Sequence, residues 1–142
     1  MSYLKYFESK AAGVVVVSMG PGDLFMEGIA EVVKKCDIHT GIIQCGLGAL
    51  KKVNFNGGSE VKELEGFFQI FNFTGLIASY TPHVHLTMVD ISNGEVLGGH
   101  LNDGSVVGAI VEFSIVRLPD LKLVSDFRDG SPVKLLDYTK EQ

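Results

Sequence analysis

Hydrophobic residues follow two different periods along this chain. Residues 13–19 read GVVVVSM, a short β-branched run that is typical of a buried strand. After a turn at Gly20-Pro21-Gly22-Asp23, apolar residues recur with helical period from Leu24 to Val33, and charged residues lie off that stripe. The pattern predicts one amphipathic helix over about residues 23–35, with Asp23 in its first turn and Lys34 and Lys35 in its last.

From residue 38 onward the pattern changes to short runs rich in Ile, Val, Phe and Thr, interrupted by Gly, Asn and Asp. Such punctuation predicts an antiparallel sheet. Gly57-Gly58, Asn93-Gly94 and Asp103-Gly104 are hairpin-turn signals, because these residues tolerate positive φ. We expect strands over residues 38–45, 52–55, 65–73, 76–80, 83–91, 95–101 and 106–118, and a loop with a short final strand, or a frayed end, over 125–142. The predicted fold class is α+β, a largely antiparallel sheet with one main helix.

Composition places the chain among ordinary globular domains. It has 142 residues, of which 46% are hydrophobic and 20% are charged. The first residues lack the pattern of a secretory signal, and no apolar run approaches the roughly 18 residues that span a bilayer. We therefore expect a single soluble domain over residues 1–142, located in the cytoplasm and not associated with a membrane.

The charge balance disfavours direct binding to DNA. The chain has 17 acidic and 12 basic residues, which gives a net charge of −5. Its only arginines are Arg117 and Arg128, and no basic run is longer than the pairs Lys34-Lys35 and Lys51-Lys52. A protein that grips phosphate backbones usually presents a basic face.

Two further patterns carry little chemistry. Cys36 and Cys45 are nine positions apart and match no CxxC pattern, so we expect two reduced thiols in or near the core. The glycine turn before the helix has the outline of an anion-binding site, but it lacks the lysine of a P-loop and the third glycine of GxGxxG. Asp23 would also repel a phosphate, which favours a plain structural turn.

The most informative segment is PHVHLTMVDISNGEVLGGHL, because three of the four histidines lie in it. Side chains two apart in a strand project from the same face, so His83 and His85 point the same way. If Asn93-Gly94 forms a two-residue turn, Thr87 lies opposite His100 and His85 lies diagonal to it. Diagonal Cα atoms are roughly 7–8 Å apart, which lets the three imidazoles converge on one ion.

Three imidazoles with an open fourth position are typical of zinc, although nickel, copper or iron also accept nitrogen ligands. The alternative is that these are ordinary surface or core histidines, the interpretation that we give to His39. Glu112, in the strand expected at 106–118, is the acid that we expect to be most buried. It could orient a ligand histidine, supply a fourth ligand or act as a base on bound water. Its alternative role is a salt bridge at an edge or subunit contact, and Asp103 is expected to be a turn residue.

These residues resemble a known family, the plants and prokaryotes conserved domain, or PPC domain. The similarity runs from about Leu4 to Leu136, and the paired HxH and GGHL motifs are its most specific part. GPGDL departs from the family, which usually has an acidic residue after the first glycine. The motifs that carry the resemblance are GPGDL, Cys45-Gly46-Leu47-Gly48-Ala49-Leu50, Glu65-Gly66, PHVHL, GGHL, the strand with Glu112, and Phe127-Arg128-Asp129.

The resemblance implies a compact α+β fold that assembles as a homotrimer. In the stand-alone prokaryotic branch it implies a metal, commonly zinc, on the residues that match His83, His85 and His100. Plant members carry AT-hook segments and serve transcriptional regulation, which is why prokaryotic members are often labelled DNA-binding. This sequence contains no such Arg-Gly-Arg-Pro hook.

Three functions therefore stand as hypotheses. The first is a homotrimeric binding or regulatory module with a metal site, whose loops bind a protein or a small molecule and which is associated with DNA only through partners. The second is a metal-dependent enzyme, with Glu112 as the base; we lean against it because the sequence shows no complete catalytic set. The third is direct binding to DNA.

Overall fold

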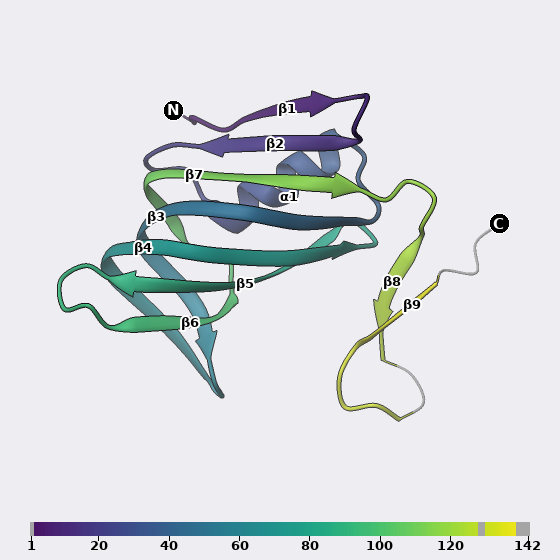
Figure 1. Cartoon of the computed structure of the whole chain (residues 1–142). Helices are drawn as coiled ribbons and strands as arrows, with labels where there is room; N and C mark the ends of the chain where they lie inside the picture. The colour runs from purple at the N-terminus through teal and green to yellow at the C-terminus, as the bar shows by residue number, and fades with distance from the viewer. Residues whose placement is uncertain (1, 128–129, 139–142) are drawn as a thin grey trace.

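The structure is a computed structural model that describes residues 2–127 and 130–138. Its main body is a seven-stranded antiparallel sheet with one helix on one face, and a two-stranded hairpin follows it (Figure 1). This is the mostly antiparallel α+β fold that the sequence predicts. The elements, in chain order, are β1 (Lys5–Ser9), β2 (Val14–Met19), α1 (Phe25–Lys35), β3 (Gly41–Gly57), β4 (Glu60–Ala78), β5 (Thr81–Asp90), β6 (Val96–Leu101), β7 (Val106–Arg117), β8 (Leu123–Asp126) and β9 (Leu135–Tyr138).

The strands are arranged in the order β1-β2-β7-β3-β4-β5-β6, and the sheet curls so that β6 also pairs with the end of β3. In that second pairing Asn56 lies opposite His100 and Phe55 lies opposite Leu101. The curl therefore gives the edge strand β6 a second neighbour, and it brings the end of β3 beside the histidine hairpin.

The core lies between α1 and the face of the sheet that the helix covers, which we call the inner face. Phe25 of the helix meets Phe73 edge to face, with ring centroids 5.1 Å apart, and Phe73 meets Phe113 at 5.3 Å. Along β5 the buried Val84 and Leu86 alternate with the exposed His83, His85 and Thr87. The histidines therefore project from the opposite face of the sheet, which we call the outer face.

The helix begins at Phe25, two residues later than predicted. Asp23 is not in its first turn, because its carboxylate accepts hydrogen bonds from the backbone N–H of Gly20 at 2.9 Å and of Tyr3 at 3.0 Å. Glu27 is the acidic residue of the first turn instead. The glycine turn is thus closed by the chain itself, in agreement with the structural interpretation of this loop.

Strands β3 and β4 are longer than predicted, because each joins two segments that the sequence separates. Irregular register between Gln44 and Leu47, and between Ile70 and Asn72, allows the strands to continue past residues that normally interrupt them. Strand β1 was not predicted. It is an exposed edge strand, so it lacks the apolar pattern of a buried one.

Several local predictions have separate outcomes. Cys36 is buried, but Cys45 is exposed at the irregular point of β3, which corrects the expectation for that thiol. Hairpin β8–β9 confirms a short final strand, and Figure 1 shows the hairpin standing apart from the sheet. Phe127 is exposed, whereas Arg128 and Asp129 of the same motif lie outside the described residues. Helix α1 is too short to span a membrane, and the described residues hold no helix that could.

Candidate metal centre

Strands β5 and β6 form the hairpin that carries the three histidines. His85 lies directly opposite His100, and Thr87 lies opposite Gly98. The predicted register, with Thr87 opposite His100, is therefore wrong by two residues. Because side chains alternate with a period of two along a strand, this shift keeps all three histidines on one face and moves His85 from a diagonal to a direct neighbour of His100.

A four-residue loop, rather than a two-residue turn at Asn93-Gly94, causes the shift. The hairpin closes at Asp90, whose N–H donates to the carbonyl of Glu95 at 2.9 Å. Asp90 Oδ1 accepts hydrogen bonds from the N–H and the hydroxyl of Ser92, and Asn93 Oδ1 accepts one from the N–H of Glu95. Such side-chain contacts to the local backbone stabilise the longer loop.

The three imidazoles converge on the outer face. Nε2 of His83 lies 3.1 Å from Nε2 of His85. The ring centroids of His83 and His100 are 4.8 Å apart, and those of His85 and His100 are 5.6 Å apart. One ring nitrogen from each residue lies within 4.8 Å of the others. The structure thus brings together the three residues that the sequence singles out.

The local environment favours neutral imidazole at two of these positions. Burial lowers the pKa of His83, and the neighbouring His85 lowers it further. Burial also lowers the pKa of His100, with further contributions from His83 and His85. Only the neutral ring offers a nitrogen lone pair to a metal ion, so the environment and the chemistry of metal binding agree.

The spacing of the nitrogens fits a tetrahedral transition-metal site. Zinc binds imidazole nitrogen at about 2.0–2.1 Å, which places two ligand nitrogens of a tetrahedral site roughly 3.3 Å apart. The contact of 3.1 Å and the upper limit of 4.8 Å lie on either side of that spacing. Within the described residues no carboxylate or thiol joins this group. Three histidine ligands would therefore leave one coordination position for an exogenous ligand.

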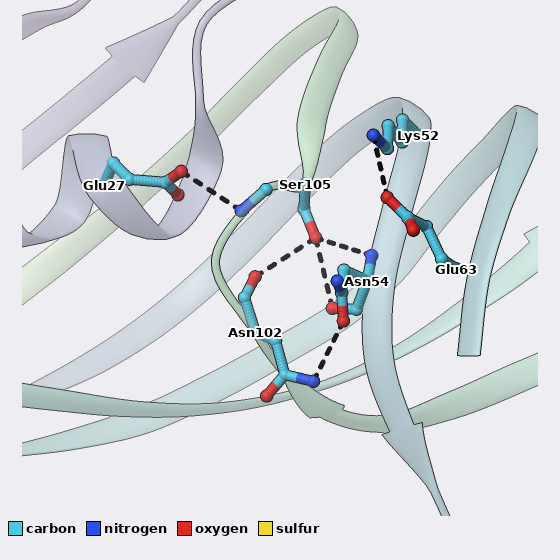
Figure 2. Close-up of polar contacts among 7 residues, drawn as sticks. Glu27, Lys52, Asn54, Glu63, Asn102 and Ser105 are labelled. Carbon is cyan, nitrogen blue, oxygen red and sulfur yellow. Dashed lines mark hydrogen bonds and ion pairs between the residues drawn. The ribbon is translucent and has the colours of Figure 1, made fainter. Parts of the chain in front are cut away.

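A polar network that the sequence analysis missed holds the strand of His100 in place. Asn102, two residues beyond His100, donates through Nδ2 to Oδ1 of Asn54 at 3.1 Å and of Asn56 at 2.5 Å. The buried hydroxyl of Ser105 accepts from the N–H of Asn54 and lies within 3.3 Å of the Asn54 and Asn102 carbonyls (Figure 2). The signal that could have indicated it is the alternation of Asn54 and Asn56 with apolar residues in β3.

The turn between β6 and β7 is tied to the helix, because Glu27 Oε2 accepts a hydrogen bond from the N–H of Gly104 at 3.1 Å (Figure 2). On the other side of the network, Lys52 and Glu63 form an ion pair of 2.8 Å between β3 and β4. The hydrogen bonds tie the residues that follow β6 to β3 and to α1, and the ion pair joins β3 to β4. The metal-site hairpin is therefore fixed from its β6 side by tertiary contacts rather than by its own turn alone.

Glu112 does not join the histidine cluster. It is exposed, which corrects the expectation that it is the most buried acid; among the acids of the described residues, Asp23 is the buried one. Glu112 lies on β7 between Ser18 of β2 and Leu47 of β3, so three strand spacings, about 14 Å, separate its strand from β5. His39 has the structural position expected for it, with Nδ1 2.9 Å from the Thr40 hydroxyl.

A pocket of 710 Å³ opens beside the histidines, between the sheet and hairpin β8–β9. His83 and His100 line its wall, together with apolar side chains from β4 and β8. The start of β8 is tied to residues next to β3 and β4, because the N–H of Leu123 donates to the Thr40 hydroxyl at 3.1 Å and the Leu123 carbonyl accepts from the N–H of Ser79. The cluster is thus accessible from a concave surface.

Solved structures share this fold at low sequence identity. A protein from Bacteroides thetaiotaomicron, described as a candidate DNA-binding protein, superposes with a TM-score of 0.83 and 18% identity over 95% of this chain and 97% of its own. The metal-containing protein from Archaeoglobus fulgidus superposes with a TM-score of 0.74 and 21% identity, over 99% of this chain and 100% of its own. A plant- and prokaryote-conserved protein from Pyrococcus horikoshii superposes with a TM-score of 0.72 and 20% identity, over 97% of this chain and 96% of its own. At these identities the likeness establishes a shared fold.

Sequence comparison supplies the family. No curated protein is significantly similar to this chain in sequence. The model of the Plants and Prokaryotes Conserved domain, however, matches residues 6–119, which include β2, α1 and the whole histidine hairpin. With most of the chain matched by that model, the chain belongs to the Plants and Prokaryotes Conserved domain family.

Proposed function

We propose that this chain is a metal-binding module that works as a homotrimer, with a divalent transition metal, zinc in the first place, on His83, His85 and His100. The observation that carries the proposal is the convergence of three ring nitrogens within 4.8 Å on a two-stranded hairpin. Three protonated imidazoles this close would repel one another, whereas a shared metal ion binds the neutral rings, which gives the cluster a physical reason.

The name of one structural relative adds support, since the Archaeoglobus fulgidus protein with this fold is described as metal-containing. Other relatives are described as candidate DNA-binding proteins. For this chain, the net charge of −5 opposes direct contact with phosphates, so we propose that any association with DNA runs through partners.

We propose a binding role rather than catalysis because of what surrounds the cluster. A side chain that takes a proton from a metal-bound water must lie within hydrogen-bond reach of it, and the strand of the candidate base Glu112 lies about 14 Å away across the sheet. Among the described residues, no other acid lies within the group of potential ligands. The open coordination position therefore suits a ligand that is held rather than converted.

The outer face of the sheet supports self-association. Large apolar side chains project from it, and those between 44% and 62% exposed include Val16, Leu47, Phe67, Phe71, Leu76 and Ile110. They come from β2, β3, β4 and β7, so they form a broad patch rather than scattered exposures. A patch of this kind on an isolated subunit is typical of a surface that is covered in the assembly.

The metal is tested by stripping the purified protein with a chelator, loading it with zinc, removing excess ion and measuring metal per chain by elemental analysis. The wild type is expected to retain one zinc ion per chain. His83→Ala and His100→Ala each remove a proposed zinc ligand. Their affinity for zinc is expected to fall by more than the roughly 10–100-fold that is typical when a residue hydrogen-bonded to a metal ligand is removed.

His39→Ala is the matched control, because His39 lies outside the cluster and should retain the full metal content. Circular dichroism of all variants checks that the fold is kept. A wild type that holds no stoichiometric transition metal, or a His100→Ala variant that binds zinc as tightly as the wild type, would show the proposal to be wrong.

A further inference from the structure

The pocket beside the histidines has a composition that indicates its ligand. Its volume of 710 Å³ lies within the range of about 300–1,000 Å³ that is usual for small-molecule sites. The imidazoles of His83 and His100 line the part that we call its polar end, and Leu76 from β4, Val124 from β8 and Leu136 from β9 contribute aliphatic side chains to the lining. Ser79, Thr81, Ser125 and Lys134 also line it, so the pocket offers both polar groups and hydrocarbon to a ligand.

Among the described residues that line the pocket, the charged side chain is a lysine. The described residues that line it include no aspartate or glutamate, although acids outnumber basic residues in the chain by 17 to 12. Lys134 is the lining residue with a full charge, and its ammonium group lies 5.8 Å from the centroid of the Phe127 ring. A cation–π contact holds the ammonium without neutralising it, so its charge remains available to an anion.

A divalent ion on the three imidazoles would add positive charge at the polar end. Neutral histidines do not cancel that charge, so the fourth coordination position would favour an oxygen anion. Hydrocarbon is favoured along the walls, because each methylene that leaves water contributes to binding. Among small anions, a carboxylate with an aliphatic chain matches both parts of the pocket, whereas inorganic phosphate matches only the polar end.

We propose that this pocket binds a small aliphatic carboxylic acid, with its carboxylate at the histidine end and within reach of Lys134 and its chain against Leu76, Val124 and Leu136. The site rests on the proposed function, since the metal is one of the two groups that would attract the carboxylate. Hairpin β8–β9 would then be a wall of the ligand site, which gives a role to an element that stands apart from the core.

The test uses zinc-loaded protein and isothermal titration calorimetry with acetate, hexanoate, hexylamine and inorganic phosphate. Hexanoate is expected to bind about 10- to 100-fold more tightly than acetate, below the limit of about fourfold for each fully buried methylene. Hexylamine, which has the same number of carbon atoms and the opposite charge, should show no binding. Hexanoate that binds no better than acetate, phosphate or hexylamine would overturn the proposal while leaving the metal site intact.

Two variants separate the contributions. Lys134→Gln is expected to weaken hexanoate binding about 5- to 10-fold with unchanged zinc content, because it removes the positive charge and leaves a polar side chain that is one atom shorter. Lys51→Gln, an exposed lysine that does not line the pocket, is the control and should leave hexanoate binding unchanged. Equal effects of the two variants would contradict a specific role for Lys134.

The dependence on metal is measured with His83→Ala, which should lose both zinc and most of the affinity for hexanoate. If it binds hexanoate as tightly as the wild type, the carboxylate is not directed to the metal and this inference is wrong. If the wild type takes up no zinc at all, the failure lies in the proposed function. Metal content and ligand affinity are recorded on the same samples, so the two failures are distinguishable.

Discussion

At the scale of single residues, Asp23 stabilises the turn that precedes helix α1. Its carboxylate is buried, with 7% of the residue exposed, and receives hydrogen bonds from the N–H groups of Gly20 and Tyr3. Burial, the largest single effect, would raise the pKa, but these bonds and one from the Ser2 hydroxyl outweigh it and lower the pKa of Asp23. The folded state therefore favours the ionised carboxylate.

The pH dependence of stability should reveal this bond network. Because the pKa of Asp23 is lower in the folded chain than its ordinary value of 3.8, its contribution is fully present above about pH 4 and is lost as pH falls through the folded pKa. Asp23→Ala should lower the free energy of unfolding by about 1–3 kcal/mol at pH 7 and remove that part of the acid-induced loss. Urea unfolding from pH 7 to pH 2 measures both effects.

Asp120→Ala is the control, since Asp120 is exposed and should leave stability and its pH profile unchanged. If Asp23→Ala loses stability on acidification as steeply as the wild type, the hydrogen bonds to this carboxylate do not contribute as described. The sequence indicated an acid at the helix entrance. It did not indicate that the acid bonds to residues outside the helix, because those partners depend on where the N-terminal segment lies.

At the scale of the elements, strand β3 depends on two of its glycines. A Cβ atom added at Gly46 would lie 2.1 Å from Cε1 of Phe73, a ring that is buried and packed against Phe25. At Gly48, where φ is +149°, an added Cβ would lie 2.2 Å from the backbone oxygen of Ile110. The irregular segment of β3 therefore approaches its neighbours more closely than a side chain allows.

Gly46→Ala is expected to lower the free energy of unfolding by about 1–3 kcal/mol, because the Phe73 ring must move within a filled core. Thermal and urea denaturation measure the loss. Gly58→Asn is the control: φ is +67° there, nothing lies within 4 Å of an added Cβ, and asparagine tolerates that conformation. A Gly46→Ala variant as stable as Gly58→Asn would contradict the close approach.

At the scale of the whole molecule, the outer face of the sheet carries an apolar patch in one region and the histidine cluster in another. Its exposed apolar patch spans β2, β3, β4 and β7, whereas the histidines occupy β5 and β6 at one side. Leu76 lies directly opposite His83, so the patch and the metal site are neighbours. Self-association through the patch would bring subunit contacts close to the metal site. These contacts need not cover the site.

Charges placed in this patch should dissociate the proposed trimer. The double variant Phe71→Lys and Ile110→Lys is expected to reduce the mass in sedimentation equilibrium to that of the 15.4 kDa chain, because buried lysines lose hydration without a partner. Ile91→Lys, at an exposed loop position, is the control and should remain associated. A double variant that keeps the mass of the wild type would place the subunit contact elsewhere.

The sequence alone determined the α+β class, the helix near residues 23–35 and the common face of His83, His85 and His100. These follow from periods of about 3.6 and 2 residues, which are local properties of the backbone. Tertiary structure alone decided that Glu112 is exposed and that β3 and β4 continue as long strands, because strand order and the close contacts at Gly46 join residues that are far apart in the sequence. The pairing of His85 with His100 became clear only in the structure, because it follows from the hydrogen bonds of the loop between Asp90 and Glu95, which the Asn93-Gly94 turn signal did not indicate.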